Sequence, residues 1–354
     1  MEENFRQDFL KSKVIIMKFC FIGNEDCKGQ DIIKAHILSQ KATMLGLRNQ
    51  NPKGQQVVIQ LGSKKESEKY PKEVGWSKAS TYRCFCADHD KKLFESIDNP
   101  VAINDITTED LFYHSLRTFA YSFYRNRYEF DQSGSFRLDF HSLSNEASQL
   151  MKNGGIPRNI IHRNTKLTTY HSFRESFIKA HLRRDYSEFD FCTFSVNIPQ
   201  LISSANFFEL PNIAPVDGPQ MATKGKYSPY SQNEVILLTV VPNGIDETRV
   251  IFCWKKNTVH SQYLMRKLRE LGDDKLTKFA SRIICQGENE NSFINLGFWE
   301  FLKSEYKSVV ENLLDTEFQL SYSIPQGLFF NFLDVKKIAG NFDIFKVGYK
   351  YLNR

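Results

Sequence analysis

Short stretches of the chain are rich in β-branched and aromatic residues and are bounded by turn-forming residues, a pattern that predicts β-strands. These stretches cover residues 14–21, 56–61, 189–196, 234–241 and 248–254. Between the last two lie Pro242, Asn243 and Gly244, followed by a few polar residues. Because an Asn-Gly pair favours a tight turn, these two stretches are predicted to form a β-hairpin.

Apolar residues recur at helical spacing in the middle of the chain. Thr107 and Asp110 resemble the start of a helix with an acidic first turn. The apolar positions that follow them are Leu111, Phe112, Leu116, Phe119, Ala120 and Phe123. Further helices are predicted over residues 166–182, 261–271, 276–285 and 298–314, with another starting near Lys91. Residues 63–78 and 211–231 contain prolines and polar residues and are predicted to be loops.

These elements predict an α+β protein of three regions. Residues 1–103 would form a small metal-binding finger, residues 104–185 a helical basic region, and residues 186–354 a mixed α+β domain of unknown role. A chain of 354 residues is long enough for this organisation.

Cysteine usage and hydropathy point to the reducing interior of a cell. The chain has seven cysteines, an odd number, and its first residues do not form a signal peptide. No stretch approaches the roughly 18 apolar residues that a membrane helix needs. We therefore expect a cytoplasmic protein without a membrane partner, in which cysteines are free thiols or metal ligands and not disulfides.

Two pairs of residues have the chemistry of a zinc site. Cys20 and Cys27 are separated by six residues, and Cys86 and His89 by two. Zinc prefers four tetrahedral thiolate and imidazole ligands, which these pairs supply, so a structural Zn²⁺ is predicted. Cys84 is an alternative to Cys86, and ordinary buried thiols are the alternative to a metal site. The scattered Cys192, Cys253 and Cys285 are predicted to be core residues.

The arrangement of these residues resembles the HNH, or ββα-metal, zinc finger, a treble-clef-like fold. A cysteine pair precedes Ala35-His36-Ile37, and the second ligand pair lies in Phe85-Cys86-x-x-His89-Asp90-x-x-Leu93-Phe94. The same residues, with Ser80-Thr81-Tyr82 between them, resemble a group of uncharacterised bacterial proteins. The resemblance covers the region from Cys20 to His89.

The resemblance implies a catalytic role for two residues. His36 matches the general base that activates water, and Asp90 falls where a metal-facing histidine usually lies. A carboxylate there would suit Mg²⁺ or Mn²⁺. Asn49 and Asn51 are positional candidates for the middle asparagine of the family. His36 has two other interpretations, a zinc ligand or a core residue, and Asp90 has one, an exposed acid at a helix start.

A concentrated positive charge follows the first predicted helix. Residues 152–184 carry eight basic side chains and one acidic residue, Glu175, a local charge of +7 in a chain of net charge +6. Clustered cations of this kind favour a nucleic-acid partner, DNA in the first instance. The candidate contacts are Arg163, Lys166, Arg174, Lys179, Arg183 and Arg184. Tyr170 and Phe173 are candidates for base stacking. The alternative is a solvated basic face.

Two functions therefore compete. The first is a metal-dependent DNA endonuclease, a phosphodiester hydrolase of HNH-like type, which by analogy would suit bacterial defence against phage. The second is a non-catalytic zinc-finger protein that binds nucleic acid or a protein partner. A third idea, an unfamiliar enzyme in the C-terminal region, rests on polar groups such as Glu288, Glu290 and Glu300 that define no chemistry.

Overall fold

The computed structural model describes residues 20–23, 27, 30–61, 71–98, 106–132, 158–210, 234–286, 291–315 and 340–354. Side chains are described over the same ranges except 125–168 and 312–315. Helices and strands follow one another in runs along this part of the chain, so that the fold is of mixed α+β class, as the sequence predicts.

The described strands form two sheets, and within each sheet all neighbouring strands are antiparallel. The smaller sheet pairs β1 (Ile32–His36) with β5 (Thr81–Cys86). The larger sheet contains β2 (Asn49–Gln50), β3 (Gln56–Leu61), β4 (Lys72–Gly75), β6 (Phe189–Val196), β7 (Ile202–Leu210), β8 (Glu234–Asn243), β9 (Glu247–Lys255) and β10 (Ser292–Ile294). Its strand order is β2-β3-β10-β7-β8-β9-β6, with β4 pairing β3.

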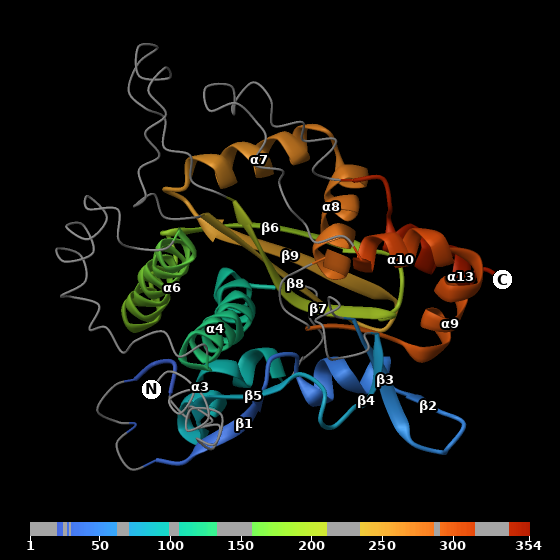
Figure 1. Ribbon diagram of the computed structural model, residues 1–354, viewed down its shortest axis with the longest axis horizontal. Coiled ribbons are helices and arrows are strands. Elements are labelled where there is room, and N and C mark those ends of the chain that lie inside the picture. The colour runs from blue at the N-terminus through green and yellow to red at the C-terminus, as the bar shows by residue number, and fades with distance from the viewer. Residues whose placement is uncertain are drawn as a thin grey trace, which may run out of the picture.

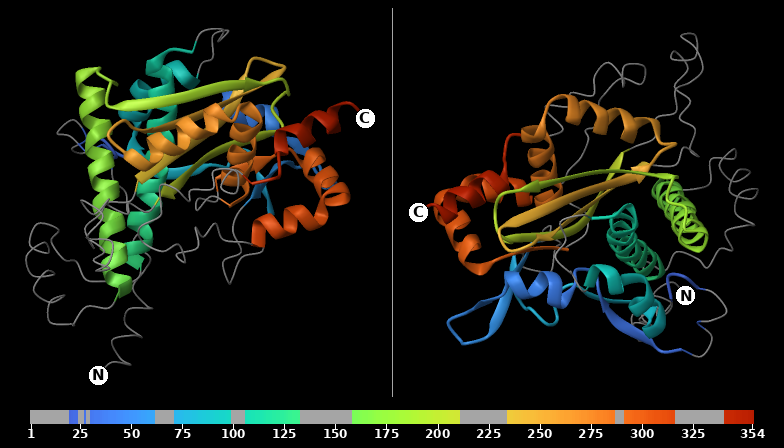
Figure 2. Two further views of the ribbon diagram at one scale, coloured as in Figure 1. Left: turned by 90° about the horizontal axis from the view of Figure 1, so that it is seen from above. Right: turned by 180° about the vertical axis from the view of Figure 1, so that it is seen from behind.

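Helices surround the larger sheet (Figure 1). They are η2 (Gln40–Met44), a π-helix, then α2 (Leu45–Leu47), α3 (Ala87–Asp98), α4 (Thr108–Gln132), α6 (Arg158–Arg183), α7 (Val259–Glu270), α8 (Asp273–Gln286), α9 (Leu296–Glu305), α10 (Lys307–Asp315) and α13 (Ile344–Leu352). Figures 1 and 2 show α4 and α6 on one face of this sheet and α7 and α8 on the other.

Strand β8 shows why both faces are covered. Val235, Leu237 and Val241 point into the core under α4 and α6, whereas Ile236 and Leu238 point into the core under α7 and α8. Successive side chains of a strand leave opposite faces, so a strand that carries apolar residues on both faces needs a layer on each side.

The larger sheet takes its strands from both ends of the chain. Residues Gln60 of β3 and Ser203 of β7 both pair with Phe293 of β10. Strands from the first and third predicted regions therefore lie in one sheet, on which α4 of the second region packs through a Thr118–Thr239 hydroxyl contact of 2.7 Å. The larger sheet therefore contains strands from before residue 103 and from after residue 185, and neither predicted boundary delimits a separate sheet.

Most predicted elements lie at the expected positions, and the exceptions have local causes. Strand β3 and the β8–β9 hairpin confirm the prediction, as does the start of α4, where Thr107 Oγ1 accepts the Asp110 amide hydrogen over 3.1 Å. The predicted helix 298–314 is instead two helices that meet at Tyr306. Part of the predicted loop 63–78 is β4, which pairs with β3. Phe21 lies in a bend and not in a strand, and residues 14–19 and 211–231 fall outside the described residues.

A histidine on α4 should make stability depend on pH. Burial and, to a smaller extent, the positive charge of Arg117 lower the pKa of His114 to about 4. The unfolded chain takes up a proton below about pH 6.5, while the folded chain stays neutral until about pH 4, so stability is lost as pH falls through this window. Urea unfolding at pH 6.5 and 5.0 should show an acid-induced loss smaller in His114→Gln than in wild type, by about 1–2 kcal/mol. Equal losses in the two proteins would contradict the assignment.

Candidate metal centre

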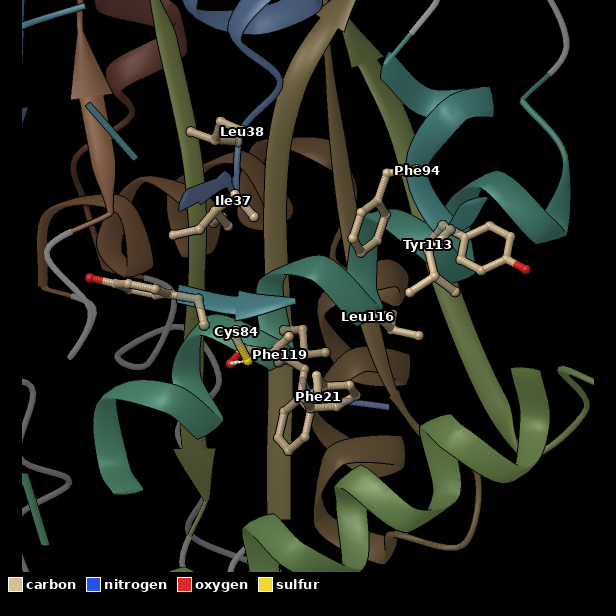
Figure 3. Packing of buried hydrophobic residues seen from close by; sticks show 14 of the residues in the cluster. Phe21, Ile37, Leu38, Cys84, Phe94, Tyr113, Leu116 and Phe119 are labelled. Atoms are coloured by element: carbon tan, nitrogen blue, oxygen red, sulfur yellow. Dashed lines mark hydrogen bonds between the residues drawn. The ribbon is translucent and has the colours of Figure 1, made fainter. Parts of the chain in front are cut away.

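The candidate centre is formed by a loop segment at residues 20–23, by Cys27, by the end of β5 and by the first turn of α3. Strand β5 ends at Cys86 and α3 begins at the next residue, which places His89 in the first turn of the helix. The loop is attached to β5 by the Phe21 amide, which donates to the Cys84 carbonyl over 2.7 Å. Phe21 is fully buried and packs edge-on against Phe119 of α4, with ring centroids 6.0 Å apart (Figure 3).

The four predicted ligands come together. Their ligand atoms all lie within 4.8 Å of one another. The Nδ1 atom of His89 lies 3.5 Å from the Cys20 sulfur, 3.3 Å from the Cys27 sulfur and 3.1 Å from the Cys86 sulfur. The sulfurs of Cys20 and Cys86 are 3.8 Å apart.

These separations are close to the edges of a tetrahedral metal site. With Zn–S of about 2.3 Å and Zn–N of about 2.05 Å, a regular tetrahedron has S···S edges of about 3.8 Å and S···N edges of about 3.5 Å. The Cys20–Cys86 and Cys20–His89 distances match these edges, and the other two are shorter by a few tenths of an ångström. The residues therefore fit a tetrahedral cation such as zinc, which would contact each of the four ligand atoms.

The chemistry of the donors also favours a cation. Burial raises the pKa of the Cys86 thiol, and the nearby Cys20 raises it as well. Several thiolates that lie close together in a buried site repel one another and lose their hydration, which is unfavourable unless a positive charge lies among them. A divalent cation supplies that charge and deprotonates the thiols, so metal binding would release protons and weaken at low pH.

The structure selects Cys86 over Cys84. The Cys84 thiol donates to the Ala120 carbonyl of α4 over 3.5 Å and is not among the clustered ligand atoms. All seven cysteines are free thiols, and Cys192, Cys253 and Cys285 are buried in the core as predicted.

His36 lies at the far end of its strand from the metal ligands. In the β1–β5 pair, Cys86 is opposite Ile32, whereas His36 is opposite Thr81. Four residues of strand separate these positions, a distance of about 13 Å. The His36 Nε2 donates to the Ser77 carbonyl over 3.4 Å, and burial lowers the pKa of its ring. The carbonyl partner agrees with the core-residue interpretation of His36, but the side chain is half-buried and lies outside the buried core.

Asp90 faces a buried cation and not an open position. Its side chain is 3.9 Å from the guanidinium of Arg117, a residue of α4 that is 3% exposed. Arg117 in turn donates two hydrogen bonds to Asp98, of 2.6 and 2.8 Å, and lies over the Phe94 ring. Sequence inspection missed this buried network, because a single Arg in an apolar helical stretch was its only signal.

The other candidates for a catalytic site are engaged elsewhere. The Asn51 side chain organises the turn after β2, accepting from the Lys53 and Gln55 amides. Asn49 accepts a hydrogen bond from Asn295. Among the described residues, the one group of three or more His, Cys, Asp or Glu side chains close enough to share an ion is the Cys₃His cluster, which includes neither His36 nor Asp90.

The basic residues of α6 separate into buried and exposed sets. Arg174 is partly buried and donates to the backbone carbonyls of Phe21 and Ile22, so its guanidinium does not face solvent as predicted. Lys179, Arg183 and Arg184 are exposed. The side chains of Arg163 and Lys166 lie outside the described residues. The two rings proposed for base stacking, Tyr170 and Phe173, are buried against α4 and the sheet, which makes that prediction wrong.

Comparisons with known proteins give no further guide to function. No family model matches the chain, and no significant match is found among curated proteins or among solved structures. The resemblance to HNH fingers therefore stays a prediction. No helix among the described residues is both long and apolar enough to cross a membrane.

Proposed function

We propose that this chain is a non-catalytic zinc-finger protein that binds nucleic acid. The observation that carries the proposal is the tetrahedral spacing of Cys20, Cys27, Cys86 and His89. Structural zinc sites have four protein ligands, whereas catalytic zinc sites keep a coordination position for water or substrate. Three thiolates and one imidazole complete the coordination, so the ion would stabilise a treble-clef-like finger and perform no chemistry.

Exposed cations at the end of α6 support nucleic acid as the partner. Lys179, Arg183 and Arg184 are solvent-exposed and form no ion pair within the described part of the chain. Phosphate backbones are bound by such groups, with release of counterions supplying much of the affinity. The sequence of α6 contains two further basic residues, Arg163 and Lys166, nearer its start.

The separation of His36 from the ligand cluster disfavours a catalytic finger. Hydrolysis at such a finger would need a base and a cation acting on the same phosphate. His36 donates to a backbone carbonyl, and Asp90 already lies beside Arg117. The predicted endonuclease, with Mg²⁺ or Mn²⁺ at Asp90, stays the competing hypothesis that the experiments below distinguish.

Nucleic-acid binding is tested by charge reversal at the exposed end of α6. The variant Lys179→Glu/Arg183→Glu/Arg184→Glu should bind duplex DNA at least tenfold more weakly than wild type, because phosphate contacts are lost and like charges are introduced. Fluorescence anisotropy over a series of salt concentrations should also show a shallower salt dependence in this variant.

A matched control changes the charge by the same amount at the other end of the molecule. Lys307, Lys346 and Lys350 are exposed on α10 and α13. Their replacement by Glu should reduce affinity much less. Equal losses in the two variants would show that only net charge matters, and unchanged binding in the α6 variant would remove α6 from the interface.

The absence of catalysis is tested with supercoiled plasmid. Wild-type protein loaded with zinc should not nick the plasmid in Mg²⁺ or Mn²⁺. Nicking that His36→Ala abolishes, with zinc content and DNA affinity unchanged, would instead establish the endonuclease.

A further inference from the structure

We propose that Arg174 of α6 is a positioning residue of the metal centre, and that it couples metal binding to the docking of this helix. The inference rests on the metal centre of the proposed function and does not depend on nucleic-acid binding. Its starting observation is that a residue 147 positions after the ligand Cys27 in sequence contacts the backbone next to Cys20.

Arg174 donates hydrogen bonds to the carbonyls of the two residues that follow the ligand Cys20. Its Nε donates to the Phe21 carbonyl over 2.7 Å, and one terminal nitrogen donates to the Ile22 carbonyl over 3.4 Å. The guanidinium also lies 5.5 Å from the Phe21 ring centroid and 5.6 Å from that of Phe123. A planar guanidinium combines two directed hydrogen bonds with ring stacking, which a lysine ammonium cannot do.

The loop conformation is adapted to this arginine. Gly23 has a φ of +60°, and a Cβ at this position would lie 2.8 Å from a terminal nitrogen of Arg174. A side chain is therefore disfavoured twice, by the left-handed backbone and by the close approach of the guanidinium. The loop follows Cys20 directly, so the placement of that ligand depends on the contact.

The charge of the metal centre favours a cation such as Arg174 beside it. A divalent ion with three thiolates and a neutral imidazole carries a net charge of −1. The guanidinium keeps its positive charge at all physiological pH values and lies on the adjoining backbone in a partly buried place. Residues that orient metal ligands from outside the coordination sphere typically contribute 10- to 100-fold to metal affinity.

The same contact links the metal to the basic helix. Arg174 lies on α6 between the buried Phe173 and Phe177, and five to ten residues before the exposed Lys179 and Arg184. Release of the metal would free the loop and remove the anchor of Arg174. The metal would then control how firmly the basic end of α6 is held.

The coupling is tested by metal affinity. Arg174→Ala should bind Zn²⁺ about 10- to 100-fold more weakly than wild type in competition with a chromophoric chelator, because the loop is no longer fixed. Arg174→Lys, which keeps the charge, should be intermediate. The Co²⁺-substituted centre of Arg174→Ala should show an altered ligand-field spectrum, which a purely distant loss of stability would not produce.

Lys346→Ala, which removes an exposed cation on α13 outside both the metal centre and the proposed nucleic-acid surface, serves as the control and should keep wild-type zinc affinity and Co²⁺ spectrum. Wild-type metal affinity and an unchanged Co²⁺ spectrum in Arg174→Ala would overturn the proposal. If that variant does not fold, wild-type affinity in Arg174→Lys overturns it. Absence of metal binding by the wild-type protein would instead refute the zinc centre itself, so the two failures are distinguishable.

Hydrogen exchange measures the link to α6. Removing zinc from the wild-type protein should lower the protection of amides at residues 170–183, and Arg174→Ala should show this lower protection even with zinc bound. Protection of these amides that is the same with and without zinc in the wild-type protein would contradict the coupling.

Discussion

Replacing Cys86 by serine is expected to abolish stoichiometric metal binding, from about one zinc per chain to near zero. A hydroxyl is a poor zinc ligand at neutral pH, and the remaining sulfurs and the imidazole cannot complete the tetrahedron. Metal binding of a finger is coupled to its folding, with apparent energies of about 10–16 kcal/mol in isolated fingers. The loop segment at residues 20–23 and the start of α3 should therefore lose their structure. Elemental analysis and limited proteolysis measure the two effects.

Cys84→Ser is the matched control, because this cysteine is two residues away and equally buried. Its thiol donates to the Ala120 carbonyl, a bond that a serine hydroxyl can also make. This variant should keep its zinc. Loss of zinc in Cys84→Ser with retention in Cys86→Ser would reverse the ligand assignment, and retention in both would refute the site.

Arg117→Met is expected to destabilise the protein by about 1.5–3 kcal/mol, because the buried guanidinium donates charge-assisted hydrogen bonds to Asp98, a carboxylate that is one-third exposed. The guanidinium is the counter-charge of Asp98, bonded at 2.6 and 2.8 Å, and lies beside Asp90. Methionine replaces most of the apolar contact with Phe94 but leaves the Asp98 carboxylate without its counter-charge, with the Ser39 hydroxyl as its remaining side-chain partner. Urea unfolding at pH 7 measures the difference.

The pH dependence of this deficit identifies its cause. Burial alone would raise the pKa of Asp98, but the hydrogen bonds and charge of Arg117 more than offset it, so that the pKa is lowered. The pair therefore contributes stability above the pKa of the unfolded chain, about 3.9, and loses it as pH falls through the lower folded value. The deficit of Arg117→Met should shrink below about pH 4. Addition of Asp98→Asn should recover part of it at pH 7, and a fully additive double variant would exclude the ion pair as the cause.

Sequence alone determined the features that depend on residue type and short spacing. Cys20, Cys27, Cys86 and His89 were identifiable because zinc selects sulfur and imidazole, and because each pair is close in sequence. Helical spacing predicted the buried face of α4, and Thr107 predicted its start, since a cap acts within one turn. Apolar and β-branched runs predicted β3, β6 and the β8–β9 hairpin for the same local reason.

Strands with polar interiors could not be predicted in this way. Strand β7 is not apparent from the sequence because Ser204 and Asn206 lie within it. Their burial is possible because the Ser292 hydroxyl of β10 accepts a hydrogen bond from Asn206 and shares one with the Ser204 hydroxyl. That partner is 88 residues from Ser204 in sequence. Three-residue β10 gives almost no signal of its own, yet it joins β3 to β7 and so unites the two ends of the chain.

The tertiary structure also decided the roles of charged side chains. Arg174 belongs to a basic stretch and was predicted to face a polyanion, but its hydrogen bonds go to the loop beside Cys20. Arg117 was an isolated cation in an apolar helix and is the centre of a buried network. His36 and Asp90 match a catalytic pattern in the sequence. In the structure, strand register places His36 about 13 Å along the smaller sheet from the metal ligands, and Asp90 lies beside Arg117. A charge acts on whatever the fold brings within a few ångströms, and sequence spacing does not contain that distance.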